Sequence, residues 1–485
     1  MTVTFNTIPS NLRVPGFYFE FDPSRANTGT QQKKLVVLGQ RLNSGSVASH
    51  TPVVISRASQ AEEYFGRGSM LADMLDMVFQ NNPQVQVWAI ASDDLPAGLA
   101  ATGSINVAGV ASTAGLLRIN VGGKTANAGI ASSDAPATVA ANIVAAINAQ
   151  TDLPISAQLN TGDTSTIDIA AKNKGVVGND IDIDLEIEAA QLPTAPTFNI
   201  TQLTGGAGNP DVADALAAMG DEWYNWIVMP WVDAANLAVL DDELNDRYSS
   251  MRQIGCRAFT AVRGSHAELL GFGNTRNNYH VTTMGCGQAP QPAYLWSAAN
   301  ATAAANSLQI DPTRQLHSLE LVGIEAPFKS LIFTKAEQNQ QLFDGISTYT
   351  VDNDGTVRIQ SQITNYQENA QGLADDSVLY VNTPEFYDAY RWEQRILFAP
   401  YARDKLADDG NKIPAGQPIM TPKKARGLLL AFYKSMVEER GWCEDYEHYK
   451  NTLIVEKQEN RLAIVDQPNQ IDNLRQIYGR SEMVK

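Results

Sequence analysis

The sequence predicts a mixed α/β fold: a mixed sheet with flanking helices, a β-rich insertion domain and extended arms at both ends. Short apolar runs alternate with amphipathic segments of helical length, which is typical of strand–helix–strand units. Residues 89–197 contain no Phe, Tyr or Trp, although aromatic residues make up 8% of the chain. The expected segments are an N-terminal arm (1–16), a first part of the core domain (17–97), a surface insertion domain (98–204), a second part of the core domain (205–455) and a C-terminal arm (456–485).

Length and charge limit the possible partners. The chain has 485 residues, enough for two or three domains, and a net charge of −17 from 36 basic and 53 acidic residues. This charge argues against a broad nucleic-acid surface and against binding to anionic membranes. The N-terminus lacks the pattern of a signal peptide, and no apolar run approaches about 18 residues. We therefore expect a protein assembled in the cytoplasm, with no nucleic-acid partner and no membrane insertion.

The three cysteines, Cys256, Cys286 and Cys443, stand far apart and show no C-x-x-C spacing. We expect free, buried thiols rather than a disulfide framework or a zinc site.

The N-terminal residues 2–16 are polar, with isolated apolar side chains at Val3, Phe5 and Ile8 and two prolines that disfavour helix. An extended arm of about fifteen residues could reach about 50 Å. The alternative is a frayed terminus.

The first part of the core domain is predicted to contain three strands and one helix. The apolar runs predict strands at residues 16–21, 34–38 and 85–90. Residues 59–79 carry apolar side chains, several of them methionines, at helical spacing. A methionine stripe of this kind is more typical of a core than of a cofactor site.

The aromatic-free insertion alternates strands with one helix. We expect strands at residues 115–121, 166–170 and 181–187, a turn at Gly122–Gly123 and a helix capped by Asp134. Acidic residues alternate with apolar ones in the last strand, which raises the alternative of a calcium site. A calcium loop needs a bend that brings its ligands together, whereas alternation places these carboxylates along one solvated strand face.

The second part of the core domain again alternates strands and helices. Strands are expected at residues 224–229, 257–262, 280–284, 346–352 and 356–364, and helices at residues 233–254, 265–270, 292–306 and 385–399. The helix at 233–254 has an apolar stripe that includes Met251. The last two strands are expected to form a hairpin around Asn353-Asp354-Gly355.

The C-terminal region is predicted to end in a segment that pairs with another chain. Thr421 caps a helix that Gly441 ends, and residues 451–456 read as a strand. A polar stretch with one proline and a short apolar tail follow. Such a tail buries little on its own chain and is typical of a segment that adds to a sheet edge.

Motifs for catalysis are weak. No phosphate-binding G-x-x-x-x-G-K-[ST] loop is present, and the runs at Gly122–Lys124, Gly271–Gly273 and Gly285–Gly287 lack the context of a nucleotide site. The five histidines have no metal-ligand spacing, and no G-x-S-x-G motif occurs. Asp408-Asp409-Gly410 could form a catalytic site with paired carboxylates, but the run is more typical of a capped turn. We expect no cofactor and no metal, although a catalytic site assembled only in space remains an alternative.

Several runs, in this order, resemble the tail sheath proteins of contractile, Mu-like phages. They are FNTIPSNLRVPGFYFEFDPSRAN, LLGFGNTRNNYHVTTMG, DPTRQLHSLELVGIEAP, EQNQQLFDGISTYTVDNDGTVRIQSQITNY, KLADDGNKIPAGQPIMTPKKARG and NTLIVEKQENRLAIVDQPNQIDNLRQIYGR. The resemblance covers nearly the whole chain and is weakest in the aromatic-free insertion. The ending RSEMVK is more polar than the family pattern, which bears on how the last strand pairs.

The resemblance implies a structural subunit rather than an enzyme. Such proteins form stacked hexameric rings around an inner tube and contract without nucleotide to drive it through an envelope. The implied partners are copies of the same chain, the tail tube protein, and baseplate and tail terminator proteins; the implied location is the virion.

The arms are expected to link subunits through six apolar residues and to face the tube through two arginines. The linking residues are Val3, Phe5, Ile8, Leu474, Ile477 and Tyr478, and the tube-facing ones are Arg475 and Arg480. Two alternatives stay open: the sheath of a phage-derived bacteriocin or injection machine, and an oligomeric α/β enzyme with a surface module.

Overall fold

A computed structural model describes residues 33–187, 196–412, 414 and 416–483. Its central element is an eight-stranded sheet with the order β15-β14-β13-β12-β11-β1-β3-β2. Six neighbouring strands run parallel, and β2 and β15 pair antiparallel at the two edges. The strands are β1 (Lys34–Gln40), β2 (Val53–Ile55), β3 (Gln86–Ser92), β11 (Trp226–Val228), β12 (Arg257–Arg263), β13 (Val281–Gly287), β14 (Ile346–Val351) and β15 (Val357–Ser361). The predicted mixed α/β class is confirmed.

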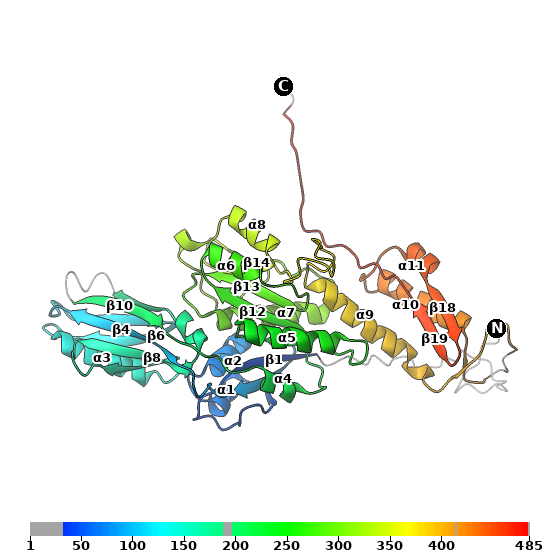
Figure 1. The fold of residues 1–485 in the computed structure, drawn as a ribbon. Helices are drawn as coiled ribbons and strands as arrows, with labels where there is room; N and C mark the ends of the chain where they lie inside the picture. The colour runs from blue at the N-terminus through cyan, green and yellow to red at the C-terminus, as the bar shows by residue number, and fades with distance from the viewer. Residues whose placement is uncertain (1–32, 188–195, 413, 415, 484–485) are drawn as a thin grey trace, which may run out of the picture. The chain divides into compact units, whose positions relative to one another are not determined.

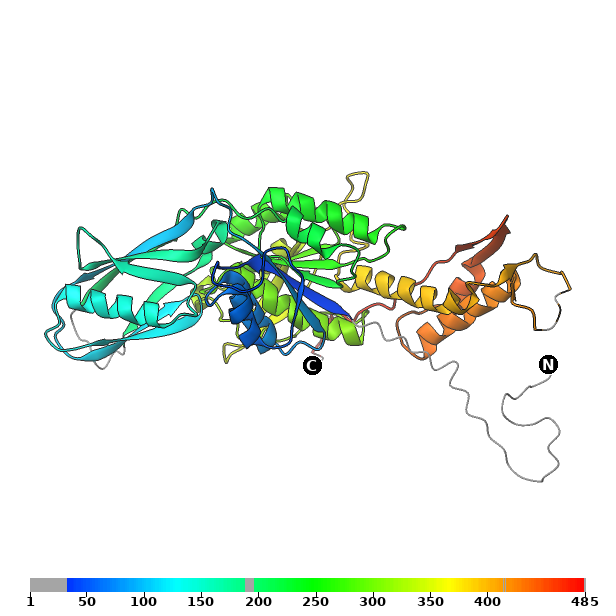
Figure 2. The same ribbon diagram turned by 90° about the horizontal axis from the view of Figure 1, so that it is seen from below.

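Helices cover both faces of this sheet (Figures 1 and 2). They are α1 (Ala58–Phe65), α2 (Met70–Gln80), α4 (Ala213–Met219), α5 (Ala234–Tyr248), α6 (His266–Gly273), α7 (Ala293–Ile310) and α8 (Lys335–Phe343), with a short 3-10 turn, η3 (Lys329–Leu331). Helix α7 packs against α2 and against β11, β12 and β13. It is buried on nearly every side, as expected for a helix that is apolar around its whole circumference.

The single helix predicted at residues 59–79 is wrong, because the chain forms two helices there. Gly66 ends α1 with a φ of 91°, and Gly68 also has a positive φ, of 72°. The Ser69 hydroxyl then accepts a hydrogen bond from the Ala72 N–H at 3.2 Å and caps α2. Left-handed glycines and a serine cap are end and start signals, so the apolar spacing had hidden a break.

The helix predicted at residues 233–254 ends early, at Tyr248. Met251, expected on its buried stripe, is 91% exposed. Beyond Tyr248 the chain turns back, and Arg252 pairs with Asp246 at 2.7 Å. The Asp233 side chain caps the start of α5 by accepting a hydrogen bond from the Asn236 N–H.

The insertion folds as two antiparallel sheets and a helix. One sheet has the order β10-β4-β8-β7 and the other β6-β5-β9. The elements are β4 (Ala100–Ala108), β5 (Gly115–Val121), β6 (Lys124–Ile130), α3 (Pro136–Ala149), β7 (Ile155–Leu159), β8 (Thr166–Lys174), η2 (Val176–Asp180), β9 (Ile183–Ile187) and β10 (Thr197–Thr204). Val, Ile, Leu and Ala side chains form its core. The three predicted strands and the Gly122–Gly123 turn are confirmed.

The insertion differs from the prediction at the start of its helix and in four strands, β4, β6, β7 and β10, that were not predicted. Ala135, not Asp134, is the residue before α3, and Pro136 occupies the first turn. The Asp134 carboxylate instead accepts a hydrogen bond from the Ala131 N–H at 2.7 Å. Strand β6 was missed because its sequence, KTANAGI, is rich in small residues with low strand propensity. It forms because the glycine turn folds it back on β5.

The C-terminal part has a core of its own, built mainly from aromatic side chains of its helices. Its elements are α9 (Asn382–Phe398), η4 (Ala399–Tyr401), β16 (Lys405–Leu406), β17 (Ile419–Met420), α10 (Pro422–Glu438), α11 (Tyr446–Thr452), β18 (Ile454–Gln458) and β19 (Arg461–Val465). The Thr421 cap is confirmed, since its hydroxyl accepts from the Lys424 N–H at 3.2 Å. The predicted strand at 451–456 is wrong at its start, because Asp445 caps α11 and the strand begins at Ile454.

The N-terminal arm (1–16) and the strand expected at 16–21 lie outside the described residues. Among the described residues, buried side chains form three clusters, in the central sheet, in the insertion and in the C-terminal part. We call these the central body, the insertion and the C-terminal body. The domain boundaries stay predictions.

Candidate interaction surfaces

The C-terminal body presents a two-stranded sheet with open edges. Strands β18 and β19 pair antiparallel with each other, and in the described part of the chain neither pairs with a third strand. Ile454 and Val465 lie opposite each other in this hairpin and are 52% and 56% exposed. Unpaired edges with exposed apolar side chains favour the addition of another strand.

The segment after the hairpin is fastened at its root by a buried phenol cluster. The Asp466 carboxylate accepts hydrogen bonds from the Tyr390 hydroxyl at 2.9 Å and from the Gln394 amide at 2.7 Å. Tyr433 stacks on Tyr449 with ring centroids 3.7 Å apart. Burial raises the pKa of Tyr390, so its hydroxyl stays protonated and can donate the hydrogen bond to Asp466.

The predicted arm residues of the C-terminus lie beyond this root and are exposed. Leu474, Ile477 and Tyr478 are 71%, 82% and 89% exposed. Each therefore has an apolar side chain free to contact another molecule. Val3, Phe5 and Ile8 lie outside the described residues, so their role stays a prediction.

The two arginines predicted to face the tube differ in their surroundings. Arg480 is exposed and pairs only with Glu482, at 2.8 Å, within the described chain. The Arg475 guanidinium lies over the Tyr380 ring, 3.1 Å from its centroid, and its Nη2 donates to the Asn382 side-chain oxygen at 3.1 Å. Arg475 is thus engaged with its own chain, which no sequence pattern had indicated.

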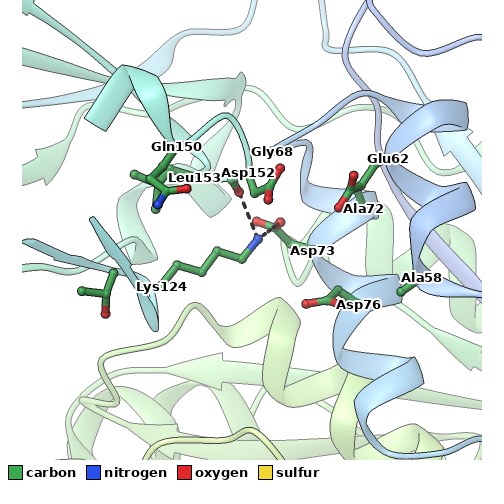
Figure 3. A pocket seen from close by; sticks show the side chains of 11 residues that line it. Ala58, Glu62, Gly68, Ala72, Asp73, Asp76, Lys124, Gln150, Asp152 and Leu153 are labelled. Carbon is green, nitrogen blue, oxygen red and sulfur yellow. Dashed lines mark hydrogen bonds and ion pairs between the residues drawn. The ribbon is translucent and has the colours of Figure 1, made fainter. Parts of the chain in front are cut away.

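A second set of polar contacts joins the insertion to the central body. Lys124, at the start of β6, places its Nζ 2.6 Å from Asp73 Oδ1 on α2 and 3.0 Å from the Asp152 carbonyl oxygen (Figure 3). The three groups border a cavity of about 270 Å³ that Glu62 and Asp76 also line. Burial raises the pKa of Asp73 to about 6, although Lys124 opposes this shift.

Other buried polar groups of the insertion also contact the central body. The Asn173 amide on β8 accepts from the Met70 N–H at 2.9 Å and donates to Asp94 at 2.9 Å. The Asp180 carboxylate accepts from the N–H of Ala293, the first residue of α7. A carboxylate there is favoured by the helix dipole. Burial nevertheless raises the pKa of Asp180 to about 6.

A third polar cluster joins α9 to the sheet and does not have the properties of a catalytic site. Arg257 Nη2 lies 2.7 Å from Asp388 Oδ2, and its Nη1 donates to His280 Nδ1 at 2.8 Å. Burial, with help from Arg257 and Arg391, lowers the pKa of His280 to about 2. The imidazole is therefore neutral and already used as an acceptor, so the cluster fastens the helix instead of transferring protons.

Two other kinds of candidate site from the sequence, metal sites and glycine-rich loops, can be compared with the described residues. In the described ranges, no three His, Cys, Asp or Glu side chains lie close enough to hold a metal ion. The Gly285 Cα faces Ile346 and Leu269, since an added Cβ would lie 2.9 Å from each, so it borders packed side chains and not an open phosphate site. No helix among these residues has both the length and the apolar character to cross a membrane.

Comparison with known proteins gives consistent matches. Residues 205–365 match a family model described as the phage tail sheath protein central domain. The tail sheath protein of the Mu-like prophage FluMu of Haemophilus influenzae is 36% identical over 488 residues, covering 99% of each chain.

Solved structures of sheath proteins are also similar. A crystal structure of a sheath tail protein from Desulfitobacterium hafniense matches with a TM-score of 0.49 and 13% identity, over 94% of this chain and 100% of that one. The cryo-EM structure of the anti-feeding prophage helical sheath in its contracted state matches with a TM-score of 0.45 and 12% identity, over 97% and 99%. The full-length match to the prophage protein decides the assignment: the chain belongs to the phage tail sheath protein family.

Proposed function

We propose that this chain is the building block of a contractile tail sheath, a structural protein of the virion tail assembled in the host cytoplasm. Copies stack as hexameric rings around the tail tube, between a baseplate and a tail terminator. The 36% identity to a phage tail sheath protein along 99% of both chains is the observation that carries this proposal.

Contraction in this proposal needs no nucleotide. The sheath assembles in a strained, extended state and releases free energy as contacts between subunits become better buried. The tube is then driven through the target envelope. Apolar burial stabilises by about 25 cal/mol per Å². The free energy released per subunit then grows with the extra apolar area that contraction buries, and it adds up over many rings.

The arms link neighbouring subunits by strand addition. The open edges of the β18–β19 hairpin can accept extended segments, and the exposed residues Leu474, Ile477 and Tyr478 lie on such a segment. Backbone hydrogen bonds made this way tolerate a rotation of the rigid bodies, because they move with the strands that make them.

Negative-stain microscopy of the purified protein tests the polymer, with long hollow tubes as the expected result. A chain that lacks residues 1–15, where Val3, Phe5 and Ile8 lie, should fold normally but form no tubes. Normal tubes from this shortened chain would show that the N-terminal arm does not link subunits.

A charge reversal tests the tube-facing surface. Arg480→Glu should weaken attachment to purified tail tubes in a co-sedimentation assay, because it places a carboxylate where we propose an acidic tube wall. Arg475→Glu is expected to act likewise, with an added effect on its contact with Tyr380. The control Arg57→Glu makes the same charge change at an exposed site of the central body. Equal attachment of all three variants would contradict the proposal.

A further inference from the structure

The extended segment at residues 466–475, which we call the strap, lies with one side against its own chain. Asp466, Pro468 and Gln470 are half-buried and alternate with exposed neighbours, and after a one-residue shift Asn473 and Arg475 are half-buried. Alternate burial is the pattern of a strand that has one face docked. From residue 476 to residue 483 every side chain is exposed.

The first half of the strap is bound to the C-terminal body. The Glu444 N–H donates to the Asn469 carbonyl oxygen at 3.0 Å, and the Ile471 N–H donates to the Trp442 carbonyl oxygen at 3.0 Å. The Asn469 N–H donates to the Tyr433 hydroxyl oxygen at 3.1 Å. Two of these bonds form an antiparallel bridge, so this half continues the backbone pairing beyond the hairpin.

The second half is bound to the central body. The Asn473 side chain donates to the Thr313 carbonyl oxygen at 3.0 Å and accepts from the Gln315 N–H at 3.1 Å. The Asn473 side-chain amide therefore makes hydrogen bonds to one carbonyl and one N–H of the loop at residues 313–315, as the backbone of a paired strand would. The Gln315 amide also donates to the Leu474 carbonyl oxygen at 3.0 Å.

Arg475 closes the strap. Its guanidinium stacks on Tyr380, and it bonds to Asn382, whose amide in turn donates to the Thr313 carbonyl oxygen at 3.1 Å. Burial lowers the pKa of Arg475 to about 10, which leaves it charged at neutral pH. A partly desolvated cation on an aromatic face is a stabilising contact.

We propose that the strap is an intramolecular fastening and that Arg475 is its positioning residue. The strap runs from the C-terminal body back to the central body. The two bodies are therefore connected twice, once through α9 and once through the strap. The free arm then begins at Gln476, and residues 476–483 are exposed. That this free arm links subunits rests on the proposed function. The attachment of the strap to its own chain does not.

Limited proteolysis of the full-length chain tests the fastening before any assembly. Trypsin cleaves after arginine, and the two arginines of this region stand five residues apart in very different surroundings. We expect rapid cleavage after Arg480 and cleavage after Arg475 that is slower by about tenfold or more, since the docked segment must detach first. Intact-mass spectrometry separates the two products. Equal rates at the two sites would overturn the proposal.

Two variants leave the sequence around both cleavage sites unchanged. Tyr380→Ala removes the stacking surface and Gln315→Ala removes the bond to Leu474. Each should speed cleavage after Arg475 by about tenfold and leave cleavage after Arg480 unchanged. Two variants keep the test decisive if one of them fails to fold, which circular dichroism would show.

A matched control removes a similar contact elsewhere. Lys424 Nζ lies 4.7 Å from the centroid of the Tyr401 ring in the C-terminal body. Tyr401→Ala should change neither cleavage rate. If folded Tyr380→Ala and Gln315→Ala proteins are cleaved after Arg475 no faster than the Tyr401→Ala protein, the strap does not depend on these contacts and the proposal fails. Tube formation does not enter the readout, so this result is independent of sheath assembly.

Discussion

Lys124 Nζ lies 2.6 Å from Asp73 Oδ1, and this ion pair joins the insertion to the central body. The Asp73 side chain is 5% exposed, whereas that of Lys124 is 31% exposed. The Asp73 carboxylate is therefore buried, whereas the Lys124 side chain that pairs with it is partly exposed to solvent. Removing the cation would leave a buried carboxylate without its partner, which is costly.

Lys124→Met is therefore expected to lower the free energy of unfolding by about 3 kcal/mol. Chemical denaturation followed by tryptophan fluorescence measures the change. The double variant with Asp73→Asn should recover much of the loss, because no unpaired charge then remains.

Arg67→Ala serves as the control for this pair. Its side chain is 59% exposed and pairs with Glu62 and Asp152 nearby. An exposed pair contributes about 0.5 kcal/mol or less. A loss for Lys124→Met no larger than that of Arg67→Ala would contradict the assigned role of the buried pair.

The same contacts predict a stability that rises in mild acid. Asp73 and Asp180 both have a pKa raised to about 6, mainly by burial, so the folded chain binds their protons more tightly than the unfolded chain. Their contribution to stability is fully present below the unfolded value, near 3.9, and is lost as the pH rises through about 6. The melting temperature should therefore rise when the pH is lowered from about 7.5 to about 5, as calorimetry can measure.

Replacing both carboxyl groups separates this effect from other titrations. In the Asp73→Asn, Asp180→Asn protein the curve should be flatter over the same range, since the variant side chains do not titrate. The groups facing Asp73 are Lys124, Asp76, Lys172 and Tyr294, and Arg263 faces Asp180. A wild-type melting temperature that falls steadily with acidification would refute the prediction.

Two glycines should respond to alanine in opposite directions. A Cβ at Gly255 would collide with the Asp388 carboxylate, which holds Arg257. Gly255→Ala is therefore expected to destabilise the chain by about 1–3 kcal/mol. Gly427 lies inside α10 with open space around it, so Gly427→Ala should stabilise by about 0.5–1 kcal/mol. Thermal denaturation measures both changes, and the same sign for both would contradict the predicted difference between a crowded and an open glycine.

The three cysteines should be unreactive in the folded protein. Cys256, Cys286 and Cys443 are each at most 2% exposed, and burial raises the pKa of Cys256 and of Cys443 to about 12. A reagent therefore cannot reach the sulfur atoms, and the thiols are not in the reactive thiolate form. A chromogenic disulfide reagent at mildly alkaline pH should label none of them natively and all three after denaturation. Rapid native labelling of any cysteine would contradict its burial.

The class of fold, most strands and the change in composition at the insertion can be predicted from the order of residues alone. These follow from local causes: apolar spacing, the cap at Thr421, and turn residues such as Gly122–Gly123. The sequence also carried the family resemblance, because that depends on residue order alone. The glycines at Gly66 and Gly68 are a local signal for a helix break. The apolar side chains continue at helical spacing across them, so a single helix was predicted.

Which polar side chains meet depends on the three-dimensional fold. Lys124 and Asp73 are 51 positions apart, and Gln315 and Asn473 are 158 apart, so no periodicity links them. Burial sets their energies as well, since a charge removed from water takes its properties from whichever group the fold places beside it. Arg475 is an example: from the sequence it is predicted to face the tube, whereas the fold places its guanidinium over the Tyr380 ring of its own chain.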